Sequence, residues 1–238
     1  EDTVIFVDAF TTWCGPCKCL AANTFTHAKV AKYYNANFIN YKVDMEKGEG
    51  PELARTFQVN AYPTLLFVNA DGKLVQKAIG AKPADAFLEL GKMVAEDGRL
   101  SLADMDDRFN NATYDRNFLR SYILRLSEAR MDYAAPLKVY RKEMTGAKMM
   151  EKDNWEMFLK IFRRTDTEEF AYVVENRKAF ENKFGKEIVQ KKLVGNYSFA
   201  IFTAFRSGDE TAYEAAKAAC KKSGLPGAEQ AVLFQDLN

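Results

Sequence analysis

Residues 13–18 read Trp-Cys-Gly-Pro-Cys-Lys (WCGPCK), and they follow shortly after the apolar run TVIFVD at residues 3–8. The β-branched run predicts a buried strand, and the residues from Cys17 to Asn35 are mainly helical in character. The two cysteines therefore lie where a strand gives way to a helix. Their spacing of three positions on a first helical turn allows them to form a disulfide.

The start of a helix favours thiol chemistry at the first cysteine of this pair. Unpaired backbone N–H groups and the positive end of the helix dipole stabilise a thiolate there and lower its pKa below the free value of about 8.5. Cys14 is therefore the predicted nucleophile. Cys17, one turn deeper, would attack the mixed disulfide that Cys14 forms and would release the reduced substrate.

Further motifs follow downstream of this pair. Tyr62-Pro63-Thr64 precedes the apolar run at residues 65–68, and residues 69–72 predict a hairpin turn. Taken together, WCGPCK, the Tyr-Pro-Thr motif and the Gly-containing hairpin resemble the thioredoxin superfamily over residues 3–98. We therefore expect an α/β thioredoxin-like domain, in which helices flank a central mixed sheet.

The resemblance implies two ionisable residues near the cysteines. Asp8 stands six residues before Cys14, where the family has a buried Asp. Burial raises a carboxyl pKa, so this group could accept and return the proton of Cys17 near neutral pH. Lys42 resembles the family's lysine partner of that Asp. The alternatives are a hydrogen-bonded strand residue at position 8 and a solvated lysine at position 42.

The resemblance also implies a groove for a substrate. Pro63 matches the family's cis proline, and the turn would present the backbone of Tyr62 to an extended substrate, with Thr64 beside it. An ordinary trans proline is the alternative. Trp13 is expected as a partly exposed wall next to the nucleophile, and Gly80 as the glycine at the edge of the groove.

The beginning of the chain departs from the family pattern. Thioredoxins have a strand and a helix ahead of the region that begins at Glu1. We therefore expect that the chain begins late relative to the family, or that another segment covers that sheet edge.

Two further cysteines need separate interpretations. Cys19 extends the pair to a CxxCxC cluster, and we expect a small, buried, apolar thiol there. Cys220 is also expected to be buried, with a Cys19–Cys220 bridge as the alternative. A Zn or Cu site would need more ligands, and the single histidine, His27, lies on a separate helical piece. We therefore predict no metal and no other cofactor.

After Gly98 the alternation typical of strands gives way to helical spacing. For example, Leu119, Tyr122 and Leu126 fall on one helical face. We therefore expect a thioredoxin-like domain at residues 1–98 and an all-helical domain at residues 99–238. Helix pairs that recur at about 35 to 40 residues suggest tetratricopeptide-like hairpin repeats.

Single polar residues predict where three of the helices begin. Thr26 is a possible cap for a second helical piece before the next strand. In the second half, Asp166 with Glu169 fits a capping box, and Asp209 could cap a later helix.

Composition excludes several classes of protein. The chain has 34 Lys and Arg against 33 Asp and Glu, so a net charge of +1 argues against a nucleic-acid partner. No run approaches the roughly 18 apolar residues of a membrane span, and no signal peptide stands at Glu1. Residues 23–25 and 44–50 resemble secreted or periplasmic bacterial disulfide reductases with a thioredoxin domain followed by helices. This resemblance implies a periplasmic or secreted location, with a cytoplasmic one as the alternative.

The resemblance favours an enzyme that reduces protein disulfides through a Cys14/Cys17 dithiol–disulfide cycle, because Gly-Pro between the cysteines resembles reducing members of the superfamily. Its partners would be disulfide-containing proteins and an upstream thiol reductant. The alternative is a protein-binding module in which the redox site is secondary. Its helical domain would recognise a partner through the aromatic residues Trp155, Phe158 and Phe162.

Overall fold

The computed structural model describes residues 3–96, 100–228, 230 and 232. The chain divides into two compact units between Tyr140 and Arg141. The boundary expected near residue 98 therefore falls inside the first unit, because the helices that follow it pack with the sheet domain. Each unit is described here by itself.

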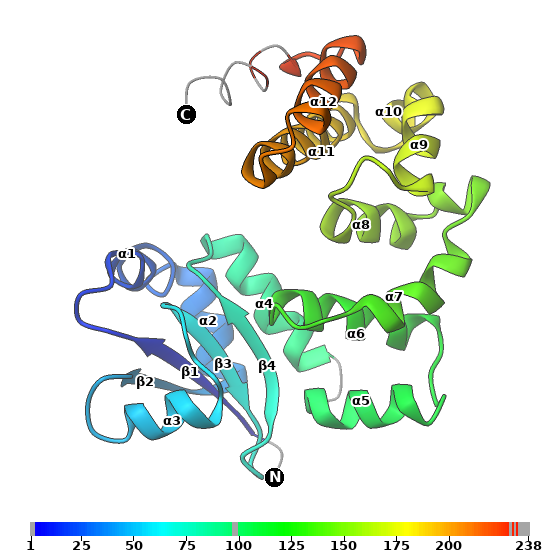
Figure 1. Cartoon of the computed structure of the whole chain (residues 1–238). Coiled ribbons are helices and arrows are strands. Elements are labelled where there is room, and N and C mark those ends of the chain that lie inside the picture. Colours follow the sequence, from blue (N-terminus) through cyan, green and yellow to red (C-terminus); the bar gives the residue numbers. More distant parts are fainter. Residues whose placement is uncertain (1–2, 97–99, 229, 231, 233–238) are drawn as a thin grey trace. The chain divides into compact units, whose positions relative to one another are not determined.

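The first unit is built on a mixed four-stranded sheet of order β2-β1-β3-β4 (Figure 1). β1 is parallel to β2 and antiparallel to β3, which is antiparallel to β4. The strands are β1 (Val4–Phe10), β2 (Phe38–Asp44), β3 (Thr64–Val68) and β4 (Leu74–Ile79). The expected mixed sheet is thus confirmed.

Helices cover both faces of this sheet. Because side chains alternate along a strand, Val4 and Phe6 of β1 enter the core beneath three helices, whereas Val7 and Ala9 enter the core on the opposite face. The first face carries α1 (Gly15–Asn23), α2 (Ala28–Asn37) and α4 (Ala84–Glu96), and the second carries α3 (Gly50–Thr56). Asp8 has the same parity as Phe6 and therefore belongs to the first face.

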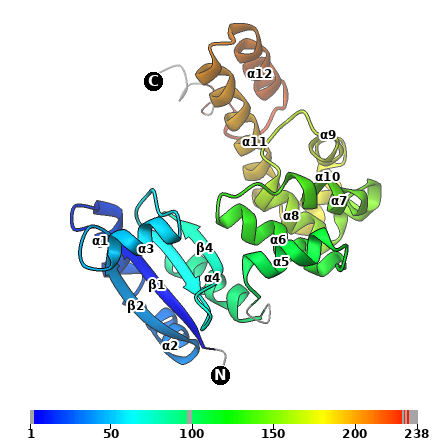
Figure 2. The same cartoon turned by 60° about the horizontal axis from the view of Figure 1, so that its bottom comes forward.

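Three more helices complete the first unit: two of them, α5 (Leu102–Asn110) and α6 (Arg116–Glu128), lie beside the edge strand β4, and the third, α7 (Ala134–Tyr140), packs on α6 (Figure 2). The fully buried Arg125 of α6 donates hydrogen bonds to the Val75 carbonyl of β4 and, at 2.7 Å, to the Leu100 carbonyl. Its Nε lies 3.2 Å from the Gln76 side-chain oxygen. Arg125 thus provides a buried donor to one β4 carbonyl and to the segment before α5.

The second unit is all-helical in its described part, as expected. It contains the 3₁₀ turns η1 (Arg141–Glu143) and η2 (Gly146–Met150), followed by α8 (Lys152–Ile161), α9 (Glu168–Glu175), α10 (Arg177–Phe184), α11 (Lys186–Ser207) and α12 (Glu210–Lys222). Trp155 stacks on Phe158 and Phe184, with ring centroids 5.5 and 5.0 Å apart. The helices range from eight to 22 residues, and the hairpin-repeat hypothesis stays a prediction.

Two of the three expected helix caps are wrong by one residue. The hydroxyl of Thr26 donates backwards to the Ala22 carbonyl at 2.6 Å, and His27 is the N-cap of α2. Thr167 rather than Asp166 caps α9 by accepting from the Phe170 N–H. Asp209 caps α12, as expected. Within the described part of the chain, every helix is too short or too polar to cross a bilayer.

Candidate active site

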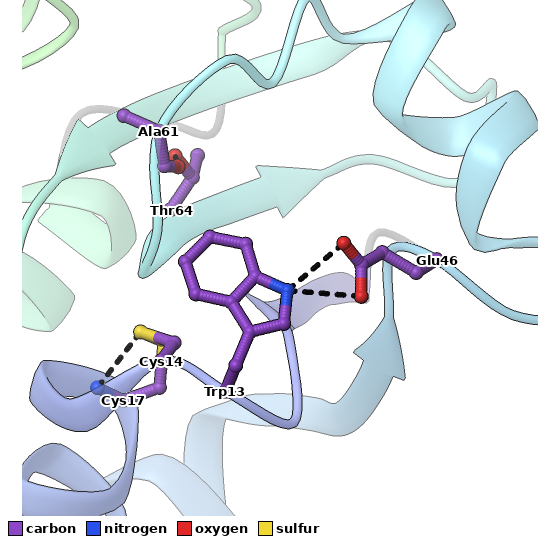
Figure 3. Close-up of a disulfide and its surroundings, with 6 residues drawn as sticks. All are labelled: Trp13, Cys14, Cys17, Glu46, Ala61 and Thr64. Carbon is purple, nitrogen blue, oxygen red and sulfur yellow. Dashed lines mark hydrogen bonds between the residues drawn. A yellow bond between two sulfur atoms is a disulfide. The ribbon is translucent and has the colours of Figure 1, made fainter.

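Cys14 and Cys17 form a disulfide at the start of α1, with their Cα atoms 5.3 Å apart. Cys14 is the N-cap residue, and its Sγ accepts the Cys17 backbone N–H at 3.1 Å (Figure 3). Pro16 occupies the first turn, where its missing N–H costs no helical hydrogen bond. The helix start therefore directs an N–H group and its dipole at Sγ of Cys14, which is the sulfur predicted to carry negative charge.

Asp8 lies in β1 with only 2% of its surface exposed. Neither of its carboxylate oxygens has a hydrogen-bond partner in the described part of the chain. Burial raises the pKa of Asp8 from 3.8 to about 6, against the opposing effect of the nearby Lys42 charge. A carboxyl group in this state can exchange a proton near neutral pH.

Lys42 is the direct neighbour of Asp8 in the parallel β1–β2 register. Its side chain is exposed, and its Nζ lies 4.5 Å from the centroid of the Phe10 ring. No direct ion pair joins Lys42 to Asp8 among the described residues. Lys42 therefore influences the pKa of Asp8 through its charge, from the solvent side of the strand.

A cavity of about 230 Å³ borders the Asp8 carboxyl group. Its lining includes the aromatic rings of Phe6, Tyr34 and Phe87 together with the polar side chains of Asn40 and Lys42. A cavity of this size with polar lining can hold water.

The loop before β3 carries the residues that the sequence predicts to meet a substrate. The Tyr62–Pro63 peptide bond is cis. The Pro63 carbonyl accepts the Gly80 N–H at 2.8 Å, and Gly80 has a φ of +94°, a conformation that favours glycine. Thr64 is fully buried and donates to the Ala61 carbonyl at 2.7 Å. Its side chain therefore holds the loop in shape.

Trp13 is held in place on the surface by a residue that the sequence does not indicate. Its side chain is 66% exposed, and its indole N–H donates to the Glu46 carboxylate at 2.9 and 3.0 Å. The indole lies beside the disulfide in Figure 3 and packs edge-on against Tyr62, with ring centroids 5.9 Å apart. Glu46 is one exposed acid in the loop after β2, 33 residues from Trp13, and no local pattern marks it.

Comparison with known proteins agrees with this geometry. Residues 1–92 match the sequence profile of the thioredoxin family. Thioredoxin-2 of Saccharomyces cerevisiae is 40% identical over 83 residues, which cover 35% of this chain and 73% of that protein. The chain belongs to the thioredoxin family. Thioredoxin-1 of the same yeast is 39% identical over 84 residues, covering 35% of this chain and 75% of its own length.

Solved structures of similar proteins cover the same share of the chain. The solution structure of a candidate disulphide-isomerase from Bacteroides thetaiotaomicron is 49% identical, with a TM-score of 0.36, and covers 39% of this chain and 76% of that one. A Thermus thermophilus thioredoxin is 26% identical, with a TM-score of 0.36, and covers 39% and 73% of the two chains.

Thioredoxin-family membership and the Cys14–Cys17 pair make this chain a thiol-disulfide oxidoreductase. Its substrates are accordingly disulfide-containing proteins, and thiol reductants are its other reaction partners. The matches to the family cover less than half of the chain, so the activity of the whole protein is a matter for proposal.

The two other cysteines of this thioredoxin-family chain are free thiols in different surroundings. Cys19 is exposed and accepts from the Asn23 amide at 3.3 Å, so the expected burial is wrong. The reason is helical geometry: Cys17 and Leu20 face the core, and a residue two positions from Cys17 points about 200° around the helix from it. Cys220 is buried, as expected. The structure therefore has no Cys19–Cys220 bridge.

Proposed function

We propose that this chain reduces disulfide bonds in other proteins, with Cys14 as the attacking thiol and Cys17 as the resolving thiol. The observation that carries the proposal is the presence of two features on consecutive elements of the fold, β1 and α1. One is the cysteine pair at the start of α1, and the other is the buried, unpartnered carboxyl group of Asp8 on the preceding strand. The Gly-Pro between the cysteines, which resembles reducing members of the superfamily, supports this direction.

The first step uses the dithiol form of the pair. The Cys14 thiolate attacks one sulfur of the substrate disulfide, which forms a Cys14–substrate mixed disulfide and releases the other substrate sulfur as a thiolate. The Cys17 N–H, directed at Sγ of Cys14, stabilises the attacking thiolate. An extended substrate segment would pair with the backbone at Tyr62, beside the cis Pro63.

The second step releases the product. Cys17 loses its proton to Asp8 and attacks Sγ of Cys14, which forms the intramolecular disulfide and expels the second substrate thiolate. Asp8 suits this role because its pKa of about 6 lets it bind and release protons near neutral pH. Two electrons pass to the substrate, and an upstream thiol reductant must return them to the pair.

A trapping experiment tests the roles of the two cysteines. Cys17→Ser should accumulate covalent mixed disulfides with target proteins, identifiable by mass spectrometry, because the second step is blocked. Cys14→Ser is the matched control, and it should trap nothing. In a protein-disulfide reduction assay, a wild-type rate no higher than that of Cys14→Ser would refute the enzymatic proposal.

The reduction potential of the pair tests the direction of the reaction. The reduction potentials of reducing members of the family are about −270 mV, and those of strong oxidants are about −120 mV. We expect a value close to the first when the pair is equilibrated with a dithiol of known potential. A value near the second would reassign the chain as an oxidase. A periplasmic or secreted location stays a prediction, to be tested by fractionation of the producing cells.

The alternative function, a binding module, was based on an exposed aromatic surface that the second unit does not have. Trp155, Phe158 and Phe162 are at most 5% exposed and form the core of the second unit. A partner-binding role for this unit therefore needs a different surface.

A further inference from the structure

One face of the long helix α11 is not covered by the rest of the second unit as the structure describes it. Its inward residues, among them Val189, Leu193 and Ile201, are fully or nearly fully buried. Large apolar side chains are nevertheless exposed on the same helix: Ile188 by 50%, Phe199 by 37% and Phe202 by 43%. Positions 188, 195, 199 and 202 are separated in turn by seven, four and three residues. They therefore lie on one helical face.

This face forms one wall of a cavity of about 450 Å³, which we call the α11 groove. Leu159 of α8 and Arg163, just beyond the end of that helix, form part of its lining. The α11 side includes Ile188, Lys191, Gly195 and Phe199. All of these residues belong to the second unit, and α8 and α11 can both be followed in Figure 2.

Gly195 is not required by the packing of the described part of the second unit. It lies in the interior of a 22-residue helix, where glycine lowers helix stability relative to alanine. A Cβ atom at this position would meet nothing within 4 Å. No neighbour in the described structure therefore requires a glycine here. The missing side chain instead leaves a depression in the exposed face, into which a side chain of another molecule can fit.

The charges around the α11 groove are all of one sign. Arg163 and Lys191 are exposed at its rim. Lys192 is deeper, where its ammonium donates to the Phe162 carbonyl at 2.5 Å and lies 5.2 Å from the centroid of the Phe158 ring. No carboxylate is among the residues that line the groove. A second copy of this chain would place cations against cations, whereas an acidic partner would be attracted.

We propose that the α11 groove binds an amphipathic, acidic helical segment of a partner protein. An apolar anchor residue of that segment would insert at Gly195 between Ile188 and Phe199, and its flanking Asp and Glu residues would face Arg163 and Lys191. A helix is the fitting occupant because a straight apolar face with i, i+4, i+7 spacing on α11 matches the same spacing on a second helix. This binding is independent of the thiol chemistry.

Selection from a helical-peptide library tests this proposal with the full-length chain as bait. The library fixes a helical scaffold and randomises two turns with apolar, acidic, basic and neutral residues. We expect the enriched peptides to carry apolar residues three or four positions apart, flanked by Asp or Glu. Their affinity should fall as salt is added, because salt screens exposed charges.

Variants of the groove locate the binding. Phe199→Ser and Gly195→Leu should each weaken the best peptide by about tenfold or more, since they remove or fill the central contact. Lys191→Glu should weaken it several-fold, whereas Lys186→Glu, outside the groove on the same helix, is the matched charge control. Circular dichroism checks that each variant remains helical, and reduction of a model protein disulfide should be unchanged.

Three results would overturn the proposal. The first is a library without enriched binders, and the second is enrichment of basic or neutral peptides. The third is binding that is insensitive to both Phe199→Ser and Gly195→Leu in folded protein. Concentration-dependent dimerisation that Phe199→Ser abolishes would instead assign the face to a second copy of the chain.

Discussion

At the residue scale, the cost of keeping Asp8 buried is the clearest sign that its position serves chemistry. A carboxyl group with 2% exposure and no hydrogen-bond partner in the described structure destabilises the fold whenever it is charged. The same burial places its pKa at about 6, in the range useful for proton transfer. At neutral pH, Asp8 thus lowers the stability of the folded protein, although the proposed second step needs Asp8 to accept the proton of Cys17.

Asp8→Asn should therefore stabilise the protein, and the gain should depend on pH. The folded-state pKa of about 6 lies above the unfolded value of 3.8, so the wild type loses stability as the pH rises from about 4 through 6. At pH values above that range, the free energy of unfolding of the variant should be about 3 kcal/mol higher than that of the wild type. At pH values below it, the two proteins should differ little. Chemical denaturation of the oxidised protein at several pH values measures this. A gain that is constant with pH would contradict the titration.

A second residue-scale feature is the contact between Trp13 and Glu46, which holds an exposed indole next to the disulfide. Ordering a large side chain before a substrate arrives reduces the entropy lost on binding. The contact is on the surface, so its effect on folding stability should be small.

Glu46→Ala should accordingly raise KM for a protein disulfide several-fold while leaving kcat nearly unchanged. The free energy of unfolding should change by less than about 1 kcal/mol. Steady-state reduction assays and denaturation measure the two effects. Glu52→Ala, an exposed acid in the first turn of α3, is the control. An equal loss in kcat would show that Glu46 acts on the chemistry rather than on substrate binding.

At the element scale, a buried arginine joins α6 to β4. Arg125 supplies donors to backbone carbonyls, and the Gln76 amide donates back to the Arg125 carbonyl at 3.1 Å. A buried guanidinium with these partners joins the helix to the sheet edge and closes that edge against other chains.

Arg125→Met should destabilise the first unit by about 3 kcal/mol or more, because it leaves buried carbonyls without donors while keeping most of the apolar stem. Lys138→Ala, an exposed lysine on α7, should stay within about 0.5 kcal/mol of the wild type. Thermal or chemical unfolding compares the two. Equal stability of both variants would mean that α6 is held by its apolar face alone.

The second element-scale prediction concerns α11. Because a Cβ at Gly195 meets no atom within 4 Å, Gly195→Ala should raise the free energy of unfolding by about 0.5 to 1 kcal/mol. Denaturation of the full chain measures this. A loss of stability would mean that the helix is more closely packed at this point than the structure shows.

At the scale of the whole molecule, the chain divides at residues 140 and 141 rather than near 98. The redox unit therefore includes α5, α6 and α7. Apolar residues of α5 and α6 form a shared cluster with Leu74 of β4. The sheet domain alone lacks the cover that these helices give its edge.

Fragments test this division. Residues 1–140 should fold and reduce a model disulfide at a rate near that of the full chain. Residues 1–98 should have a lower unfolding temperature and a stronger tendency to associate, because β4 is left uncovered. Calorimetry and light scattering compare the two fragments. Equal stability of the two fragments would place the domain boundary near residue 98, where the sequence pattern predicts it.

The sequence by itself determined the strand–CxxC–helix arrangement, the mixed sheet and the helical second half. These features depend on local periodicity and on short motifs such as WCGPCK, which the chain carries within a few residues. The burial of Asp8 was expected from the resemblance to the thioredoxin superfamily, in which a buried Asp stands six residues before the first cysteine.

Tertiary structure alone decided the features that join residues distant in sequence. Glu46 meets Trp13 across 33 residues and Arg125 meets Val75 across 50, and no local pattern encodes either contact. Exposure was likewise decided in three dimensions, since Cys19 faces solvent while Trp155, Phe158 and Phe162 form a core. Apolar residues recur along a helix with the same spacing whether the face that they form is buried or exposed. Only the packing of the other elements shows which faces remain open, and the exposed face of α11 carries a groove.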